Sequence, residues 1–452
     1  MKNSNNELII SRILHAGYLF EDSEDRILFD PIFENPFSVN CYAFPAIKFL
    51  TEKLSQQKFS AVFISHYHED HCSFESLNFL DRNTPIYMFC IYTEMFELLK
   101  DLGFHNAHSL ELNKEITIGN FKIKTLPALD RDVDCIFHIN YLNLNILNVV
   151  DSWIDDLTFT KSIEQNIWDL VLWPFQTMRE LQVLSPMRQG SAIVEIPPEW
   201  IDQLSKMNIR ILVPSSCQFK MEDWSWYNKS FFPISYQYFY EIISTISSLK
   251  RTQVYRFEPG GRVKLSESSF EEISPIDWIQ VLDSKESDYE FIADNVPSSM
   301  EFIANHLAHP TEYELQKTLN FCNIEICKQW TNLVPEDYFS KSRLWQLKLY
   351  GPNGTSFSFL YEIHASSIRM VFESELQVSW LTEIPLVKVY AALEAGESLT
   401  SIYIRINNTI FDSLTESELQ NVDLLEDPLL RILYNGQFAS YQKAQLKRIK
   451  LN

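Results

Sequence analysis

A seven-residue segment with three histidines, Ser65-His-Tyr-His-Glu-Asp-His71, most constrains what this chain can fold into. It directly follows the apolar run Ala61-Val-Phe-Ile64, which predicts a short strand covered on both faces. Imidazole nitrogens and carboxylate oxygens are typical ligands of zinc, iron and manganese. In such a loop His66 and His68 can serve one metal, while Asp70 and His71 turn toward a second. A solvated loop that happens to be rich in histidine is the alternative interpretation.

The segments around this loop alternate between short apolar runs and amphipathic stretches. An opening hairpin is expected over 8–14 and 26–30, and helices over 46–54, 73–80 and 92–102. Further strands are expected at 85–90, 115–118, 121–126, 135–142, 145–150, 170–173 and 209–214. Because many of these strands end in polar residues, the pattern predicts an α/β fold of the αββα sandwich type, with site residues on loops at strand ends.

Pro259-Gly-Gly261 predicts a domain boundary, which divides the chain into a catalytic domain over 1–260 and a C-terminal α+β domain over 261–452. Helices are expected at 275–282, 288–306 and 312–328, and a strand at 399–406. Pro352-Asn-Gly354 predicts the turn of a hairpin. The C-terminal arrangement faintly resembles sterol-carrier-like domains, which hold an apolar pocket. We expect this domain to form a substrate pocket, a lid or a dimerisation surface.

The segment Phe63-Ile-Ser-His-Tyr-His-Glu-Asp-His-Cys72 resembles the HxHxDH signature of the metallo-β-lactamase superfamily. Upstream, Leu14-His-Ala-Gly17 and Ile27-Leu-Phe-Asp-Pro31 are similar to the opening of its lactonase and phospholipase-like branches. The resemblance covers roughly residues 8–235. It implies an enzyme with two metal ions, of which His66, His68, Asp70 and His71 are ligands.

The same resemblance implies further ligands, and two of the expected histidines are missing. Leu126-Pro-Ala-Leu129 is followed by Asp130 where the family has a histidine, so Asp130, or Asp132 two residues later, is expected to replace it, with His138 in the next strand as a further alternative. Asp151 follows an apolar strand and is expected to bridge both metals, although it could also cap a helix. Val213-Pro-Ser-Ser-Cys-Gln218 lacks the last histidine. Either the second metal has an open position or Cys217 or Glu180 substitutes.

A ligand set of three histidines and several carboxylates shifts the preference from zinc toward iron or manganese. The chain thereby resembles two oxygenase branches, the CMP-sialic acid hydroxylase type and the chloramphenicol-pathway diiron β-hydroxylase. We therefore expect a dinuclear non-haem iron oxygenase that uses dioxygen, with Asp70 and Asp151 as catalytic residues and an external electron donor. Its substrate is expected to be a small organic or carrier-linked molecule. A metal-dependent hydrolase of an ester, lactone or phosphodiester is the alternative, and a scaffold without metals is the third hypothesis.

Four further residues are candidates for substrate contact. His15 lies at a turn that the family places near the metal pocket, although a structural role is the alternative. Arg179 and Glu180 follow the strand after Asp151, and Arg179 could pair with a substrate carboxylate or phosphate, or form a surface ion pair instead. Cys217 completes the set. Asp30 is expected to hold the histidine loop, because metal-bound imidazoles commonly donate their other N–H to a carboxylate.

The net charge of −22 disfavours binding to nucleic acid. The N-terminal segment lacks the apolar run of a signal peptide, and no window approaches the ~20 apolar residues of a membrane span. We therefore expect a cytoplasmic protein, for which a homodimer is one option. Seven cysteines without paired spacing are expected to be reduced thiols.

Overall fold

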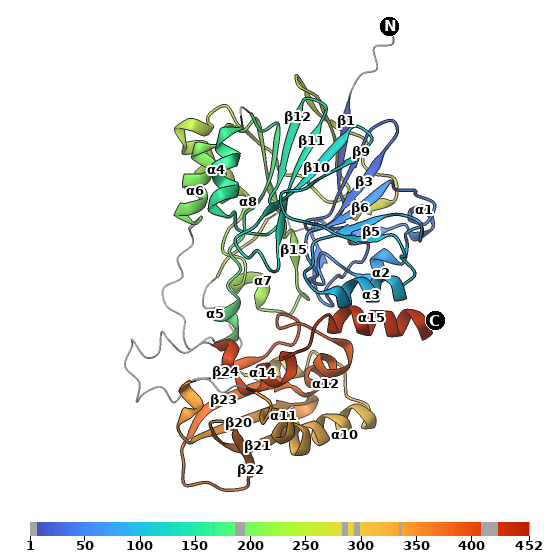
Figure 1. The fold of residues 1–452 in the computed structure, drawn as a ribbon. Coiled ribbons are helices and arrows are strands. Elements are labelled where there is room, and N and C mark those ends of the chain that lie inside the picture. The colour runs from blue at the N-terminus through green and yellow to red at the C-terminus, as the bar shows by residue number, and fades with distance from the viewer. Residues whose placement is uncertain are drawn as a thin grey trace.

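The computed structural model describes residues 7–165, 167–185, 195–282, 288–292, 299–333, 337–407 and 424–451. Toward the N-terminus a pair of β-sheets lies face to face with helices outside them, and a smaller sheet with its own helices forms the C-terminal region (Figure 1). This arrangement confirms the αββα sandwich and the C-terminal α+β domain expected from the sequence.

The first sheet has eight strands and mixes antiparallel and parallel pairs. In spatial order they are β18 (Phe270–Ile273), β17 (Arg262–Leu265), β1 (Leu8–Arg12), β2 (Tyr18–Glu21), β3 (Arg26–Phe29), β6 (Ala61–Ile64), β7 (Ile86–Met88) and β8 (Ala107–Ser109). From β3 to β8 all neighbours are parallel. The carboxyl ends of β3 and β6 therefore lie at the same edge, where Asp30 and the histidine loop follow them.

The second sheet has seven strands. In spatial order they are β16 (Gln253–Val254), β14 (Ile211–Ser215), β13 (Leu170–Pro174), β12 (Leu144–Asn148), β11 (Cys135–Tyr141), β10 (Phe121–Pro127) and β9 (Glu115–Ile118). Strands β12, β13 and β14 are parallel, so the loops after them, including the one that carries Asp151, leave from one edge.

The core between the sheets consists of alternate side chains from both, such as Phe29 and Phe63 from the first and Phe137 from the second. Their rings are in contact, with centroids 5.3 Å apart for the pairs Phe29–Phe63 and Phe29–Phe137. The opposite side chains of the same strands pack against helices. These are α2 (Phe74–Leu77) and α3 (Thr93–Asp101) at the first sheet, and α4 (Asp156–Glu164), α6 (Pro198–Lys206) and α8 (Tyr236–Thr245) at the second.

The C-terminal region is built on a five-stranded sheet in the order β22 (Ser367–Val371), β21 (Ser356–His364), β20 (Arg343–Tyr350), β23 (Val378–Pro385) and β24 (Arg405–Asn407). The hairpin β20–β21 turns at Pro352–Gly354, as the sequence predicts. Helices α9 (Met300–Ala304), α10 (Glu312–Asn320), α11 (Ile326–Trp330), α12 (Leu386–Ala395) and α14 (Pro428–Tyr434) accompany the sheet. A buried cluster of aromatic and aliphatic residues, including Trp330, Trp345 and Trp380, forms its separate core.

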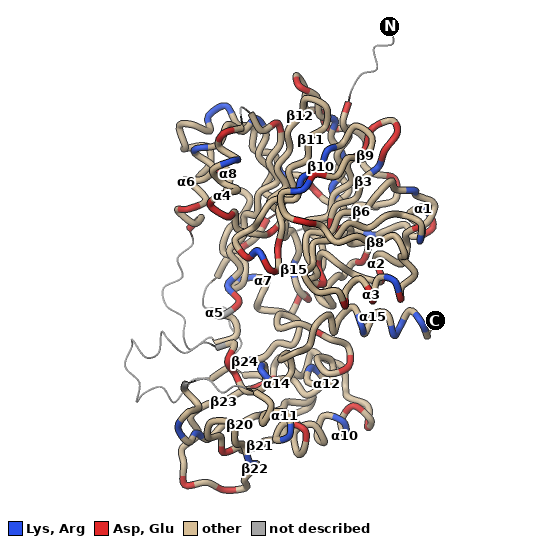
Figure 2. The backbone as a smooth tube through the Cα atoms, in the orientation of Figure 1, with Lys and Arg blue, Asp and Glu red and all other residues tan. Residues whose placement is uncertain are grey.

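The last helix, α15 (Ser440–Leu451), leaves this region and returns to the N-terminal sandwich (Figure 1). It packs on α2 and α3. Its basic residues, which colour the helix blue in Figure 2, form ion pairs with acidic residues of these helices: Lys443 with Glu94, Arg448 with Glu75 and Lys450 with Asp101. Contacts of this helix thus join the C-terminal region to the sandwich.

Several predicted elements differ from the structure. The helix expected over 46–54 is the strand β5 (Ile47–Phe49) followed by the single turn α1 (Thr51–Leu54), because β5 pairs with β19 (Ile279–Val281). The helix expected over 275–282 is wrong for the same reason. The long helix expected over 288–306 is, among the described residues, only the short helix α9 (Met300–Ala304). The strand expected over 399–406 begins only at β24 (Arg405–Asn407), and turns precede it. The helix expected over 312–328 is confirmed, with a π-helical turn between α10 and α11.

All seven cysteines lie within the described residues and are free, and six of them are buried. None of the helices in the described ranges has the length and apolar character that a membrane crossing requires.

Candidate metal centre

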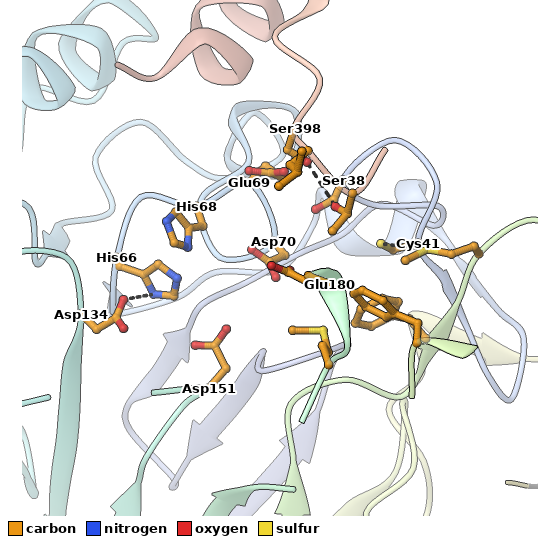
Figure 3. Close-up of a pocket in the computed structure, with 16 residues that line it drawn as sticks. Ser38, Cys41, His66, His68, Glu69, Asp70, Asp134, Asp151, Glu180 and Ser398 are labelled. Carbon is orange, nitrogen blue, oxygen red and sulfur yellow. Dashed lines mark hydrogen bonds and ion pairs between the residues drawn. The ribbon is translucent and has the colours of Figure 1, made fainter. Parts of the chain in front are cut away.

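The histidine loop and Asp151 meet beyond the carboxyl ends of β6 and β12, one strand from each sheet (Figure 3). Ligand atoms of His66, His68 and Asp70 lie within 4.8 Å of one another, and so do those of His15, Asp70, His71 and Asp151. Asp70 belongs to both groups. The structure thus brings all the predicted ligands of the loop together with Asp151, in two adjoining groups that share a carboxylate.

Asp30, at the end of β3, fixes the orientation of two imidazoles. Its fully buried carboxylate accepts hydrogen bonds from the backbone N–H of Ser65 at 2.7 Å and from the Ser65 hydroxyl at 2.8 Å. The Nδ1 atom of His71 lies 3.2 Å from the same carboxylate, and Nδ1 of His66 lies 2.9 Å from Ser65 Oγ. Since the Ser65 hydroxyl donates its hydrogen to Asp30, it accepts from His66. Both imidazoles therefore carry a proton on Nδ1, so Nε2 is the atom of each ring that would bind a metal.

Asp151 reaches the cluster through an unusual turn after β12. Val150 has a positive φ of 64°, which is rare for a β-branched residue, and this turn aims the next side chain at the histidines. Oδ2 of Asp151 lies 3.1 Å from Nε2 of His71. Asp151 is not the N-cap of α4, because Asp155 takes that position.

The electrostatics of the cluster favour bound cations. Burial alone would lower the pKa of His71, but the carboxylates of Asp151 and Asp70 and their hydrogen bonds raise it well above its usual value. Burial opposes ionisation of Asp151, yet His71 and His66 hold the pKa of Asp151 well below its usual value. Burial, followed by the neighbouring His71, lowers the pKa of His66 well below normal, so its imidazole stays neutral.

His15 lies beside the cluster but differs from the other three histidines. Its Nε2 atom is 3.2 Å from Oδ2 of Asp70 and 3.2 Å from Nε2 of His71. Its Nδ1 atom accepts a hydrogen bond from the backbone N–H of Cys217 at 2.9 Å, so a neutral His15 carries its proton on Nε2. His15 is therefore a hydrogen-bond donor toward Asp70. It could bind a metal through Nε2 only if that proton moved to Nδ1 and the hydrogen bond from Cys217 were lost.

The structure places neither Asp130 nor Asp132, the expected third ligand, at the cluster. Both are exposed, in a tight turn in which the N–H of Asp134 donates to the carbonyl of Asp130 at 2.9 Å. This turn directs Asp134 inward instead. Its Oδ1 atom lies 3.8 Å from Nδ1 of His66, and burial, followed by the nearby Asp151, raises the pKa of Asp134 to about 6. The sequence did not indicate Asp134, because alignment with the family's histidine points to Asp130. Which carboxylate faces the cavity is decided by the turn over 130–134.

A cavity of about 410 Å³ opens over the cluster. Its lining combines candidate ligands with apolar, hydroxyl and acidic side chains: Ser38, Cys41, His66, His68, Glu69, Asp70, Asp134, Asp151, Met178, Glu180, Phe219, Met221, Phe231, Ser398, Leu399 and Thr400. Ser398, Leu399 and Thr400 come from the C-terminal region, and Ser398 lies beside Glu69 in Figure 3. Sequence reasoning missed this contribution, because no motif marks the segment.

Of the expected substrate contacts, Glu180 lines the cavity, at the start of α5 (Glu180–Leu184). Burial, followed by the charge of Asp70, raises the pKa of Glu180. Cys217 is buried next to His15 and burial raises the pKa of its thiol, so the group is protonated. The guanidinium of Arg179 lies over the ring of Phe291, at 5.4 Å, and does not line the cavity.

The model of a family described as the β-lactamase superfamily domain matches residues 10–147. No curated protein matches the chain.

Several solved structures are similar to the chain. Igni18, a metallo hydrolase from Ignicoccus hospitalis, has 14% identity and a TM-score of 0.38 over 57% of this chain and 99% of its own. CmlA, a diiron beta-hydroxylase from Streptomyces venezuelae, has 15% identity and a TM-score of 0.38 over 57% of this chain and 54% of its own. YhfI, a metallo-beta-lactamase fold protein from Bacillus subtilis, has 17% identity and a TM-score of 0.39 over 57% of this chain and 99% of its own.

The two facing sheets, the HxHxDH loop after β6 and the match that runs from β1 to β12 agree with one another. The N-terminal region of this chain therefore has the metallo-β-lactamase fold, and its residues 10–147 match the β-lactamase superfamily domain.

Proposed function

We propose that the chain is an enzyme with two metal ions in the cavity of the metal centre. His66, His68 and Asp134 would hold one ion, Asp70 and His71 would hold the other, and Asp151 would be a ligand available to both. The donor set fits such ions, because ligand atoms of His66, His68 and Asp70 lie within 4.8 Å of one another, and so do those of Asp70, His71 and Asp151. The orientation of His66 and His71 by Ser65 and Asp30 is the second support.

We further propose that both ions are iron and that the reaction is a dioxygen-dependent hydroxylation. The observation that carries this proposal is the carboxylate Asp134 beside His66, together with the lack of a histidine in 213–218. Three imidazoles and several carboxylates form a harder ligand set than that of the zinc hydrolases. Two bound irons would supply the activation of dioxygen, with electrons from an external donor.

The cavity residues determine what the substrate can be. Its volume of about 410 Å³ suits a small organic molecule or the end of a carrier-linked one. Phe219, Met221 and Phe231 offer an apolar wall that excludes water, whereas Glu69 and Glu180 can accept hydrogen bonds from the substrate. We propose that these side chains orient the substrate over the metal ions.

In this proposal the C-terminal domain forms one wall of the substrate pocket and is not a separate dimerisation unit. Ser398, Leu399 and Thr400 line the cavity, and Ser398 hydrogen-bonds Glu69. Strands β17, β18 and β19 follow residue 260 and pair with β1, β17 and β5, so we propose a domain boundary after 282 instead of 260. A homodimer and the external electron donor stay predictions.

A metal-dependent hydrolase is the second candidate, and His15 is the observation that favours it. The Nε2 atom of His15 lies 3.2 Å from that of His71. If the proton of His15 moved from Nε2 to Nδ1, at the cost of the hydrogen bond from Cys217, Nε2 could bind the second metal and the ligand set would approach that of a zinc hydrolase, in which the metals stabilise a developing oxyanion.

Metal analysis separates these candidates. The chain, expressed in medium supplemented with iron and zinc, is expected to contain two irons, and its reaction is expected to consume dioxygen. The readouts are elemental analysis of the purified protein, and oxygen uptake with a chemical reductant and a panel of small organic substrates. Two zinc ions per chain, with hydrolysis of a generic ester in anaerobic buffer, would contradict the oxygenase.

Substitution of the three aspartates of the turn tests the third ligand. Asp134→Ala is expected to lower the affinity for one metal ion by at least tenfold, because it removes a cavity carboxylate beside His66. Asp130→Ala and Asp132→Ala are the matched controls, since they change exposed aspartates of the same turn. Metal content after dialysis against a chelator is the measurement. If either control loses a metal ion and Asp134→Ala does not, then Asp130 or Asp132 is the third ligand, as expected from the sequence.

A further inference from the structure

A buried glutamine connects the last helix of the chain to the loop that carries the histidines. The side chain of Gln442, on α15, is 2% exposed. Its Nε2 atom donates hydrogen bonds to the carbonyl oxygens of Tyr67 and Cys72, both at 2.8 Å. Tyr67 lies between His66 and His68, and Cys72 directly follows His71. One side-chain amide therefore joins the two ends of the ligand loop.

The loop between these two carbonyls is a closed turn. The N–H groups of His71 and Cys72 both donate to the carbonyl of His68, at 3.0 and 2.8 Å. An amide NH₂ group has two hydrogens, and Gln442 uses one for each end of the turn. The separation of Tyr67 and Cys72, and with it the direction of the imidazoles between them, is thus set from a helix about 370 residues away in the sequence.

Helix α15 is itself held firmly enough to set this geometry. Gln445, one helical turn after Gln442, is fully buried. It donates to Ser73 Oγ at 2.8 Å and accepts from the N–H of Phe74 at 2.7 Å. The ring of Phe438, just before the helix, packs on that of Tyr67 with centroids 4.9 Å apart.

We propose that Gln442 is a positioning residue of the metal centre, and that α15 belongs to the centre rather than being an appendage of the C-terminal domain. The proposal rests on the proposed pair of metal ions. Residues that orient ligands from outside typically change metal affinity 10- to 100-fold when they are replaced. Gln442 acts on the backbone of the ligand loop, so we expect an effect at the lower end of that range.

Two methionine variants test the proposal, with Co²⁺ as the probe ion. Gln442→Met keeps the length of the side chain and removes both N–H groups. Gln445→Met makes the same change at an equally buried position of the same helix, where the hydrogen bonds go to Ser73 and Phe74 beyond the ligands. The visible absorption spectrum of the Co²⁺-loaded chain and the Co²⁺ affinity against a competing chelator are measured, together with stability in urea.

Gln442→Met is expected to lower the affinity about tenfold and to change the Co²⁺ spectrum. Gln445→Met is expected to lose stability but to keep the wild-type spectrum. Should Gln442→Met not fold, Gln442→Asn replaces it; this variant keeps the amide on a shorter side chain and is expected to show a smaller change of the same kind.

Wild-type affinity and spectrum in a folded Gln442 variant would overturn the proposal. An equal change of spectrum in Gln445→Met would also overturn it, because the effect would then belong to the whole helix. If the unaltered chain binds no Co²⁺, the proposed metal centre itself is wrong. This outcome differs from the one in which the chain binds Co²⁺ but Gln442 has no effect.

Discussion

Asp30→Asn is expected to leave the fold intact and to abolish metal binding at His71. The asparagine oxygen can still accept from the Ser65 N–H, but its NH₂ group would then face Nδ1 of His71, where the carboxylate now accepts a hydrogen bond. Because two donors repel, His71 would move its proton to Nε2, which is the atom that must stay bare to bind a metal. Metal content and the Co²⁺ spectrum are the measurements.

Asp30→Ala gives a different result, and the pair of variants separates folding from metal binding. The alanine leaves the buried N–H groups of Ser65 and His71 without an acceptor. Each unpaired group destabilises the fold by ~1–3 kcal/mol. We therefore expect a loss of ~2–6 kcal/mol in the free energy of unfolding. Asp132→Asn is the control, since Asp132 is exposed. If Asp30→Asn binds two metal ions as tightly as the unaltered chain, the assigned proton positions are wrong.

The candidate ligands whose positions could be predicted from the sequence are those that local pattern determines. His66, His68, Asp70 and His71 are within six residues and directly follow a strand whose four residues are all buried. Their positions relative to one another are set by that strand and by the turn after it. The place of Asp151 was predictable for the same reason, because it follows the apolar strand β12.

The proposed third ligand could not be placed from the sequence because the turn before β11 is determined by distant contacts. The N–H of Leu129 donates to the carbonyl of Trp153 at 2.8 Å, and Ala128 forms a bridge with Ile154. These contacts hold the end of β10 against the segment after Asp151. Only then does the turn direct Asp134, rather than Asp130, toward the histidines.

The secondary structure shows the same limit. Residues 46–54 have a composition compatible with a helix, yet Ile47–Phe49 pairs with Ile279–Val281, more than 200 residues later. Pairing of this kind overrides the weak local preference for a helix. The cavity wall at Ser398–Thr400 and the hydrogen bonds of Gln442 likewise arise only when the C-terminal region folds back on the sandwich.

Gly396→Ala is expected to disturb both of these C-terminal contributions at once. Gly396 ends α12 with a φ of 65°, and a Cβ atom there would lie 2.4 Å from the backbone N of Tyr441, at the start of α15. A backbone contact that short cannot be relieved by a side-chain rotation, so α15 or α12 must move. Gln442 is the next residue of α15, and Ser398 lies two residues after the glycine.

Gly436→Ala is the matched control for this variant. Gly436 has a similar φ of 69°, but no atom lies within 4 Å of the position of its Cβ. Both variants carry the cost of a left-handed alanine, ~1–2 kcal/mol, and only Gly396→Ala adds the overpacking cost of ~1–3 kcal/mol. Unfolding in urea should therefore show a greater loss for Gly396→Ala, and Co²⁺ affinity should fall in that variant alone. Equal losses of stability with unchanged Co²⁺ affinity in both would mean that the junction of α12 and α15 does not support the metal centre.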